Sequence, residues 1–243
     1  MVAVAFVLLE EARSPDPAEV VRRASQFGYS LVYDEGSASP STFTIASGGN
    51  VMVMLIEAPH PDAAKMAPGL ASPSEEDLAR MRAHYIVAMM GGPETPREQD
   101  TMLAQITAAI VRASPAIGAM LGTGRCFHRA DFFAEVVERT PAELPMLVCI
   151  DFTRAPEPGD RMSILSHGMV RYGREEFFVT CSIRGKGAFD FVMSMVGWML
   201  DDATKELPTG DTVGRNANER IVVQRVPSPL GEGPPVIKLD LDL

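Results

Sequence analysis

The sequence predicts an α+β fold, with a mixed, largely antiparallel sheet and helices packed mainly on one face. Apolar runs of strand length recur along the chain, and capped helical segments separate some of them. Other strand-like runs follow one another with no helix between them. Because doubly wound parallel sheets alternate strand and helix regularly, the consecutive strands favour antiparallel pairing.

The chain opens with a predicted strand and helix. Residues 2–9 are continuously apolar, as expected for a central strand covered on both faces. Asp16 then supplies an N-cap and Pro17 the first helical residue. Gly28 follows the last residue with helical spacing and ends the helix.

A hairpin and a second set of strand and helices follow. Segments 41–46 and 50–57 flank a Gly-Gly-Asn turn, and the second of them is apolar on both faces, which predicts a central strand. Ser74 opens a short helix, and 85–90 is another continuously apolar strand. Thr95, followed by proline, begins a long helix with an apolar stripe.

The remaining predicted elements fill the second half of the chain. Helices are expected at 131–138 and 188–200, and strands at 116–121, 146–152, 162–172, 176–183, 220–226 and 236–241. The last strand alternates apolar with charged residues, which indicates a sheet face open to water near an edge.

The length bounds the domain organisation. A chain of 243 residues buries roughly 70–75% of its unfolded surface, so it needs no disulfide or metal to hold a core. We expect one compact α+β domain over 1–243, or two intimately packed halves, 1–113 and 114–243. The opening strand-helix-strand-strand-helix-strand order is typical of ferredoxin-like halves.

Charge and cysteine content exclude several classes of function. The formal net charge is −10 and no basic run is present, so the Lys and Arg side chains that nucleic-acid binding requires are lacking. Such acidity favours a cationic protein partner. The cysteines, Cys126, Cys149 and Cys181, are too widely spaced for a disulfide framework or a zinc knuckle. With neither a signal-peptide pattern nor a membrane-length apolar run, a cytoplasmic location is predicted.

Several stretches together resemble a known family. They are 168–178 (GMVRYGREEFF), 197–200 (GWML), 207–214 (LPTGDTVG), 219–229 (ERIVVQRVPSP) and 236–241 (VIKLDL). In this order they resemble the C-terminal module of a bacterial family catalogued only as a domain of unknown function, and 116–133 resembles the region before it. The resemblance implies a cytoplasmic bacterial protein with no established catalytic residues, in an immunity or accessory role beside toxin or secretion-system genes. Trp198 stands where a smaller or aliphatic residue is expected.

The segment LPTGDTVG is a candidate site or a turn. It follows a predicted helix, precedes a strand and has no lysine, so its order is the reverse of a phosphate loop. Asp211 would also repel a phosphate. The Asp, Thr and Gly residues are those that a tight turn uses. We predict a turn and keep Asp211 and Thr212 as candidate partner contacts.

A basic loop is the better candidate anion site. Arg184 and Lys186 lie between a predicted strand and the N-terminus of helix 188–200, where they could hold a phosphate or an acidic side chain. Glu176 is a candidate acid or base beside them. The alternative is a solvated loop that happens to be basic.

Metal and aromatic features are weaker. Cys126, His128 and Asp131 carry metal-capable atoms at short spacing, but they supply too few ligands for a closed tetrahedral site. The sequence therefore predicts no metal and no cofactor. Helix 188–200 is apolar around an unusually wide arc that includes Trp198, so the arc either lies under a second layer or binds a partner.

These observations lead to two hypotheses of different classes. The first is a non-enzymatic protein-binding protein, an immunity or accessory factor that neutralises or escorts a cationic toxin or a secretion-system component. The alternative is a small-molecule or phosphate-ligand-binding enzyme that uses Arg184, Lys186 and Glu176. A purely structural or self-assembling module is a third reading, suggested by the exposed terminal strand.

Overall fold

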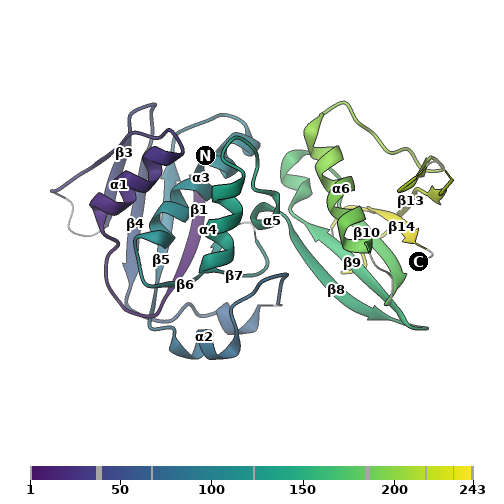
Figure 1. Cartoon of the computed structure of the whole chain (residues 1–243), viewed down its shortest axis with the longest axis horizontal. Helices are drawn as coiled ribbons and strands as arrows, with labels where there is room; N and C mark the ends of the chain where they lie inside the picture. Colours follow the sequence, from purple (N-terminus) through teal and green to yellow (C-terminus); the bar gives the residue numbers. More distant parts are fainter. Residues whose placement is uncertain are drawn as a thin grey trace. The chain divides into compact units, whose positions relative to one another are not determined.

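The computed structural model describes residues 2–36, 40–66, 68–122, 124–183, 187–216, 218–231 and 233–241. They form two compact units, Met1–Asp151 and Phe152–Leu243, and the fold is a mixture of α and β elements (Figure 1). The predicted halves met at 113/114, where the long helix ends. The boundary lies at 151/152 because the next strand and helix pack onto the N-terminal sheet.

The N-terminal unit is built on a seven-stranded sheet of order β2-β3-β4-β5-β1-β6-β7. All of its pairings are antiparallel. Its strands are β1 (Val2–Leu9), β2 (Leu31–Tyr33), β3 (Ser41–Ile45), β4 (Asn50–Ile56), β5 (Ala83–Met90), β6 (Ala116–Leu121) and β7 (His128–Arg129). Because β2 to β5 form a meander, a ferredoxin-like order is not found in this sheet.

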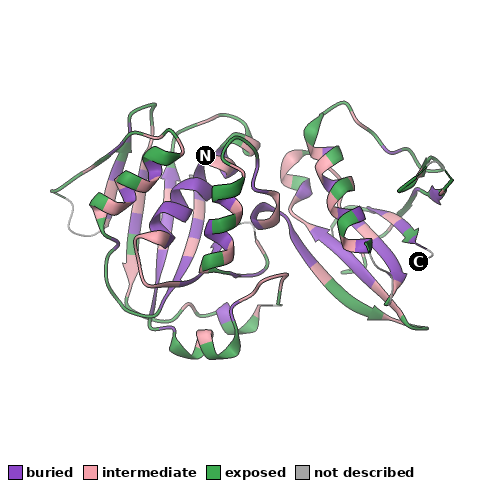
Figure 2. Ribbon diagram, in the orientation of Figure 1, coloured by how far each residue is buried: buried purple, intermediate pink, exposed green. Residues whose placement is uncertain are grey.

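Helices α1, α3 and α4 lie along one face of this sheet (Figure 1). The unit's helices are α1 (Pro17–Gln26), the 3-10 helix η1 (Ala63–Lys65), α2 (Glu75–Arg80), α3 (Pro96–Arg112), α4 (Ala130–Arg139) and α5 (Met146–Cys149). Helix α3 is the most deeply set, with buried residues along its length (Figure 2). Residues on this face of the sheet, such as Val7 and Tyr85, are fully buried.

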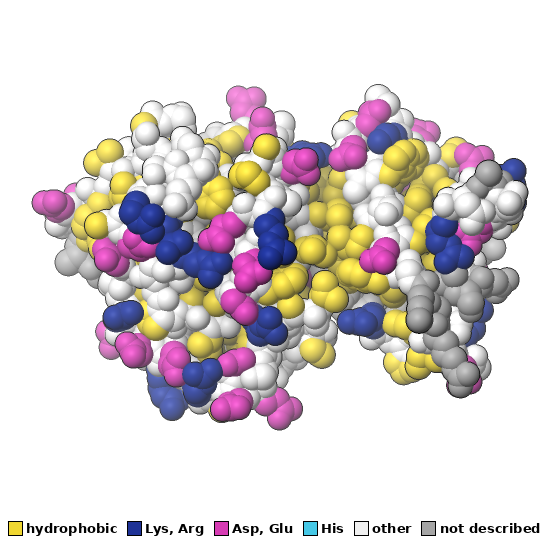
Figure 3. Space-filling model, in the orientation of Figure 1, with side chains coloured by type: hydrophobic (Ala, Val, Ile, Leu, Met, Phe, Trp, Pro, Cys, Tyr) yellow, Lys and Arg dark blue, Asp and Glu magenta, His cyan; other side chains and the backbone are white. Residues whose placement is uncertain are grey.

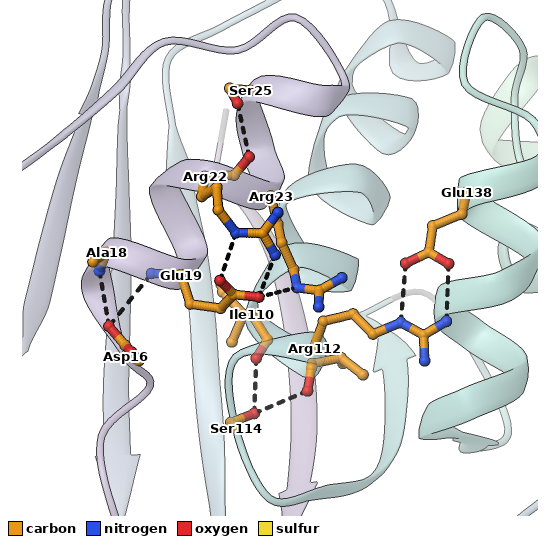
Figure 4. Close-up of polar contacts among 11 residues, drawn as sticks. Asp16, Ala18, Glu19, Arg22, Arg23, Ser25, Ile110, Arg112, Ser114 and Glu138 are labelled. Atoms are coloured by element: carbon orange, nitrogen blue, oxygen red, sulfur yellow. Dashed lines mark hydrogen bonds and ion pairs between the residues drawn. The ribbon is translucent and has the colours of Figure 1, made fainter.

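The predicted caps form as the sequence indicates. Asp16 accepts hydrogen bonds from the backbone N–H groups of Ala18 and Glu19, at 3.0 and 3.3 Å, and Pro17 is the first residue of α1 (Figure 4). Arg112 at the end of α3 makes a two-point ion pair with Glu138 of α4, with both N···O distances at 2.9 Å (Figure 4). Local sequence thus sets where these helices begin, and long-range pairs hold them side by side.

Among the described residues of this unit, no such helix layer lies on the opposite face of the sheet. The segment with η1 and α2 packs at one end of that face, and a buried cluster lies there, made of Leu8, Ala63, Met81, Ile117, Met120 and Phe127. The prediction that β1 is covered on both faces is therefore wrong over part of its length. Val4 is half-buried, and Phe6 is half-buried where it packs against this cluster.

The C-terminal unit has a five-stranded sheet of order β13-β14-β10-β9-β8. Strands β10 and β14 are parallel, and the pairs β9/β10 and β13/β14 are antiparallel. Its elements are β8 (Asp151–Glu157), β9 (Arg161–His167), the 3-10 helix η2 (Met169–Tyr172), β10 (Phe177–Ser182), α6 (Ala188–Asp201), β11 (Thr212–Val213), β12 (Ile221–Val222), β13 (Gln224–Val226) and β14 (Val236–Leu241). Helix α6 packs on β10, and β14 lies one strand in from the edge.

Three predicted strands differ from the structure. Residues 146–149 form α5 instead of a strand, because a short apolar run fits a buried helix equally well. The strand predicted at 162–172 ends at His167, since Gly168 with φ +118° turns the chain into η2. The strand predicted at 220–226 is divided into β12 and β13.

Candidate functional site

Glu176 holds the connection between β9 and β10. Its carboxylate accepts hydrogen bonds from the Ser166 hydroxyl at 2.6 Å, from the Gly168 N–H at 2.7 Å and from the Val170 N–H at 3.4 Å. The Ser166 Oγ in turn accepts the Phe177 N–H at 2.8 Å. Oε1 orders the start of η2 and Oε2 binds the Ser166 hydroxyl of β9, so Glu176 has a structural role at this position.

The segment LPTGDTVG contains a tight turn and then pairs as a strand. The Asp211 N–H donates to the Pro208 carbonyl at 3.1 Å, and Gly210 has φ +94°, which gives a type II β-turn. The Asp211 carbonyl accepts the Val223 N–H at 2.8 Å, and Thr212 pairs with Val222 between β11 and β12. The side chains of Asp211 and Thr212 are exposed.

A hollow of about 550 Å³ adjoins this turn in the C-terminal unit. It is lined by Gly173, Arg174, Glu175, Met199, Lys205, Glu206, Leu207, Pro208, Thr209 and Arg225. Its cationic side chains already have partners: Arg225 pairs with Glu175 at 2.7 and 2.8 Å, and Arg174 donates to the Lys205 and Asp202 carbonyls. The described residues therefore present an incoming anion with cations that are already engaged.

The other predicted residues of this unit fall in two groups. Arg184 and Lys186 lie outside the described residues, so the predicted anion loop stays a prediction. Trp198 on α6 is 38% exposed, and the Lys205 ammonium lies 5.1 Å from its ring centroid, a cation–π contact. Hydrophobic side chains gather over α6 (Figure 3).

A buried cluster of three polar side chains lies in the N-terminal unit. The Cys126 thiol donates to Asp151 Oδ1 at 3.1 Å, and His128 Nε2 lies 3.4 Å from the same oxygen. The Cys126 Sγ and His128 Nε2 are 4.0 Å apart. The Arg125 N–H donates to Asp151 Oδ2, which fixes the plane of the carboxylate. All three side chains are at most 4% exposed.

The cluster is electrostatically unlike a catalytic cysteine site. Burial, followed by the Asp151 charge and its hydrogen bond, raises the pKa of the Cys126 thiol, so the reactive thiolate is disfavoured. Burial also opposes ionisation of Asp151, but hydrogen bonds from His128, Arg125 and Cys126 outweigh it and lower the pKa of that carboxyl. One imidazole nitrogen faces both partners, and His128 Nδ1 is buried with no hydrogen-bond partner among the described residues.

The sequence placed Asp131 close to Cys126 and His128 and predicted no metal site there; in the structure a different carboxylate lies beside the two side chains. Asp131 is exposed and pairs with Arg129 at 3.1 Å, away from Cys126. The carboxylate that joins the cluster is Asp151, which directly follows the apolar run MLVCI at 146–150. The position of Asp151 at the end of an apolar run was the available sequence signal. Because Asp151 is far from Cys126 and His128 in the sequence, this signal did not show that they are neighbours.

The face of the N-terminal sheet opposite α1, α3 and α4 exposes apolar side chains. Its rows follow from the strand register: Met54 pairs with Ile86, and Met52 pairs with Ala88, which pairs in turn with Val4. We call this surface the open face; its apolar members are Val4, Val32, Met52, Met54, Ile86, Ala88 and Met90, with Thr42, Thr44 and Asn50 among them. Every one of these side chains is half-buried or exposed, and Met54 and Met90 are 41% and 36% exposed.

Comparisons of the chain with models of protein families, with curated proteins and with solved structures return no match. None of the helices in the described part of the chain combines the length and the apolar character that crossing a membrane requires.

Proposed function

We propose that this chain is a non-enzymatic protein that binds another protein through the open face. The proposal rests on the half-buried and exposed apolar side chains of a sheet face over which the described residues of the N-terminal unit place no helix layer. Contiguous exposed apolar surface of this kind is typical of interaction sites in proteins that otherwise bury such residues. Methionines, which adapt their shape to different surfaces, make up three of its apolar members.

The charge of the chain supports a basic partner. The formal net charge is −10, and acidic residues follow the ends of the strands that form the open face: Asp34 and Glu35 after β2, and Glu57 after β4. A partner with an apolar surface flanked by Lys and Arg fits this distribution. With the family resemblance, this favours a cationic toxin or secretion-system component, encoded nearby, that the chain neutralises or escorts.

The test uses the purified product of the adjacent gene in a calorimetric titration. We expect the unmodified chain to bind it and Met54→Asp to weaken binding at least about tenfold, because a charge would then be buried in an apolar contact. Gln26→Asp is the matched control, because it adds the same charge at an exposed position of α1 on the other side of the sheet. The added negative charge alone would strengthen attraction to a cationic partner, so a loss specific to Met54→Asp reports apolar contact.

Two outcomes would contradict this proposal. One is the absence of binding to the neighbouring gene product, together with no protection of cells that express it. The other is binding that Met54→Asp and Gln26→Asp leave equally strong, which would place the contact elsewhere on the chain.

A further inference from the structure

We propose that Cys126, His128 and Asp151 form a binding site for a divalent transition-metal ion such as Zn²⁺. The geometry is the first argument. One ligand atom from each residue, Sγ, Nε2 and Oδ1, lies within 4.8 Å of the others, and the separations are 3.1, 3.4 and 4.0 Å. A tetrahedral zinc ion with bonds of about 2.0–2.3 Å separates its ligands by about 3.3–3.7 Å. The side chains need only sub-ångström adjustment to surround one ion.

The chemistry of the donor set is the second argument. Thiolate, imidazole and carboxylate together are a ligand combination that zinc accepts, whereas magnesium and calcium require oxygen ligands. Three protein ligands leave the fourth tetrahedral position for a water molecule or another small ligand. A Zn²⁺ ion bound by one thiolate and one carboxylate is also electrically neutral as a unit.

Burial of the carboxylate is the third argument. Asp151 is almost fully buried, and among the ion pairs of the described residues its partner is His128, which is cationic only when protonated. Buried carboxylates are generally paired with a cation or coordinate a metal. A divalent ion between the three side chains supplies the missing positive charge.

The backbone around the cluster is shaped to allow close approach. A Cβ at Gly69 would lie 2.3 Å from Cys126 Sγ, so only glycine fits there. The Gly69 N–H donates to Ser72 Oγ at 2.7 Å, which holds the loop in place. The Arg125 N–H orients Asp151 through its second oxygen, as second-shell groups do at metal sites.

Metal binding at this site has a defined proton balance. In the metal-free form the thiol proton is donated to Asp151 Oδ1, and a proton on His128 Nε2 can reach the same oxygen. Binding forms the S–metal, N–metal and O–metal bonds, releases the thiol proton to solvent and moves the imidazole proton to Nδ1. One proton is therefore released for each ion bound by a neutral histidine.

The experiment uses the full chain without an affinity tag, stripped with a chelator and titrated with Zn²⁺, and separately with Co²⁺ as a spectroscopic probe. We expect one equivalent of Zn²⁺ to bind, a denaturation temperature that rises with Zn²⁺ concentration, and a thiolate-to-cobalt charge-transfer band. Cys126→Ala should lose the band and the bound equivalent. Cys181→Ala, which alters a buried cysteine of the other unit, should keep both.

A second variant guards against misfolding. Asp151→Asn keeps the size of the side chain but removes its charge, and we expect it to fold and to weaken Zn²⁺ binding at least about 100-fold. The proposal is overturned if the unmodified chain binds less than one equivalent at micromolar Zn²⁺, or if bound Co²⁺ shows no thiolate band. It is equally overturned if Cys126→Ala retains the metal, which would mean adventitious binding only. None of these results depends on a protein partner.

Discussion

The two faces of the seven-stranded sheet are built from similarly apolar residues but are covered differently. On the face that carries α1, α3 and α4, Val53 and Met89 are 2% and 0% exposed. Their neighbours along the same strands, Met54 and Met90, point to the open face and are 41% and 36% exposed. The difference teaches that apolar character on both sides of a strand shows it to be central in its sheet, without showing that both faces have a helix layer.

The largest expected effect comes from the adjacent methionines of β5. Met89→Ala should lower the free energy of unfolding by about 2–4 kcal/mol, because it opens a cavity under the helices. Met90→Ala should change it by less than about 0.5 kcal/mol. Urea unfolding followed by far-UV circular dichroism measures both, since the single tryptophan, Trp198, reports on the other unit. Equal losses for the two variants would show that the open face is covered after all.

An intermediate effect on stability is expected from removing the helix caps of α2 and α3, which lie on opposite faces of the sheet. Ser74 caps α2, which packs at one end of the open face, and its Oγ accepts the Asp77 N–H at 3.1 Å. Thr95 caps the buried α3 and accepts the Glu98 N–H at 3.3 Å. Alanine at either position should remove about 1 kcal/mol of helix stability.

The two losses should appear in different measurements. Thr95→Ala should lower global stability, because α3 unfolds with the core. Ser74→Ala should mainly speed hydrogen exchange of the amides at 75–80, because α2 has no fully buried residues and can open locally. If Ser74→Ala lowers the global midpoint as much as Thr95→Ala does, α2 is as firmly part of the core as α3.

The smallest expected effect is a pH dependence beside the buried cluster that η1 and α2 cover. His60 lies edge-on to Phe6, Phe127 and His84, with ring centroids 5.1, 5.2 and 5.1 Å away. Burial lowers the pKa of His60, and the neighbouring His84 lowers it further. The unfolded chain, with a histidine pKa of about 6.5, then binds the proton more readily than the folded chain.

The sign follows from this difference in proton uptake. The contribution of neutral His60 is fully present above about pH 6.5 and is lost as the pH falls towards its folded-state pKa. Urea midpoints at pH 7.5 and 5.5 should therefore differ less in His60→Phe than in the unmodified chain, since the effects of other groups cancel in the comparison. A pH difference identical in the two proteins would contradict the assignment.

The bounds of helices and strands could be predicted where residues close in sequence determine them. Asp16, Pro17 and Thr95 placed the starts of α1 and α3 correctly, because a cap needs only its own first turn. Alternation in 236–241 gave β14 its correct bounds. The segment 146–152 was assigned wrongly because apolar residues there are compatible with either a strand or a helix.

The candidate sites were less accessible to sequence reasoning. Cys126, His128 and Asp131 were noted for their short spacing and predicted to form no metal site, and the Asp131 carboxylate points to Arg129 at the surface. Asp151 joins them through the fold alone. The open face was equally hidden, because strand residues facing a helix layer and those facing away from it are chosen from the same apolar set.

The sequence by itself determined the α+β class, the starts of the capped helices and the turn within LPTGDTVG, since each depends on contacts between residues a few positions apart. Only the tertiary structure decided that Asp151 meets Cys126 and His128, and that, among the described residues, helices cover one face of the sheet broadly and the other face at one end. Both depend on contacts between distant segments. Which distant segments pack together depends on the energy of the whole fold, because the chain has fewer helices than apolar surfaces to cover. The local sequence pattern therefore does not predict it.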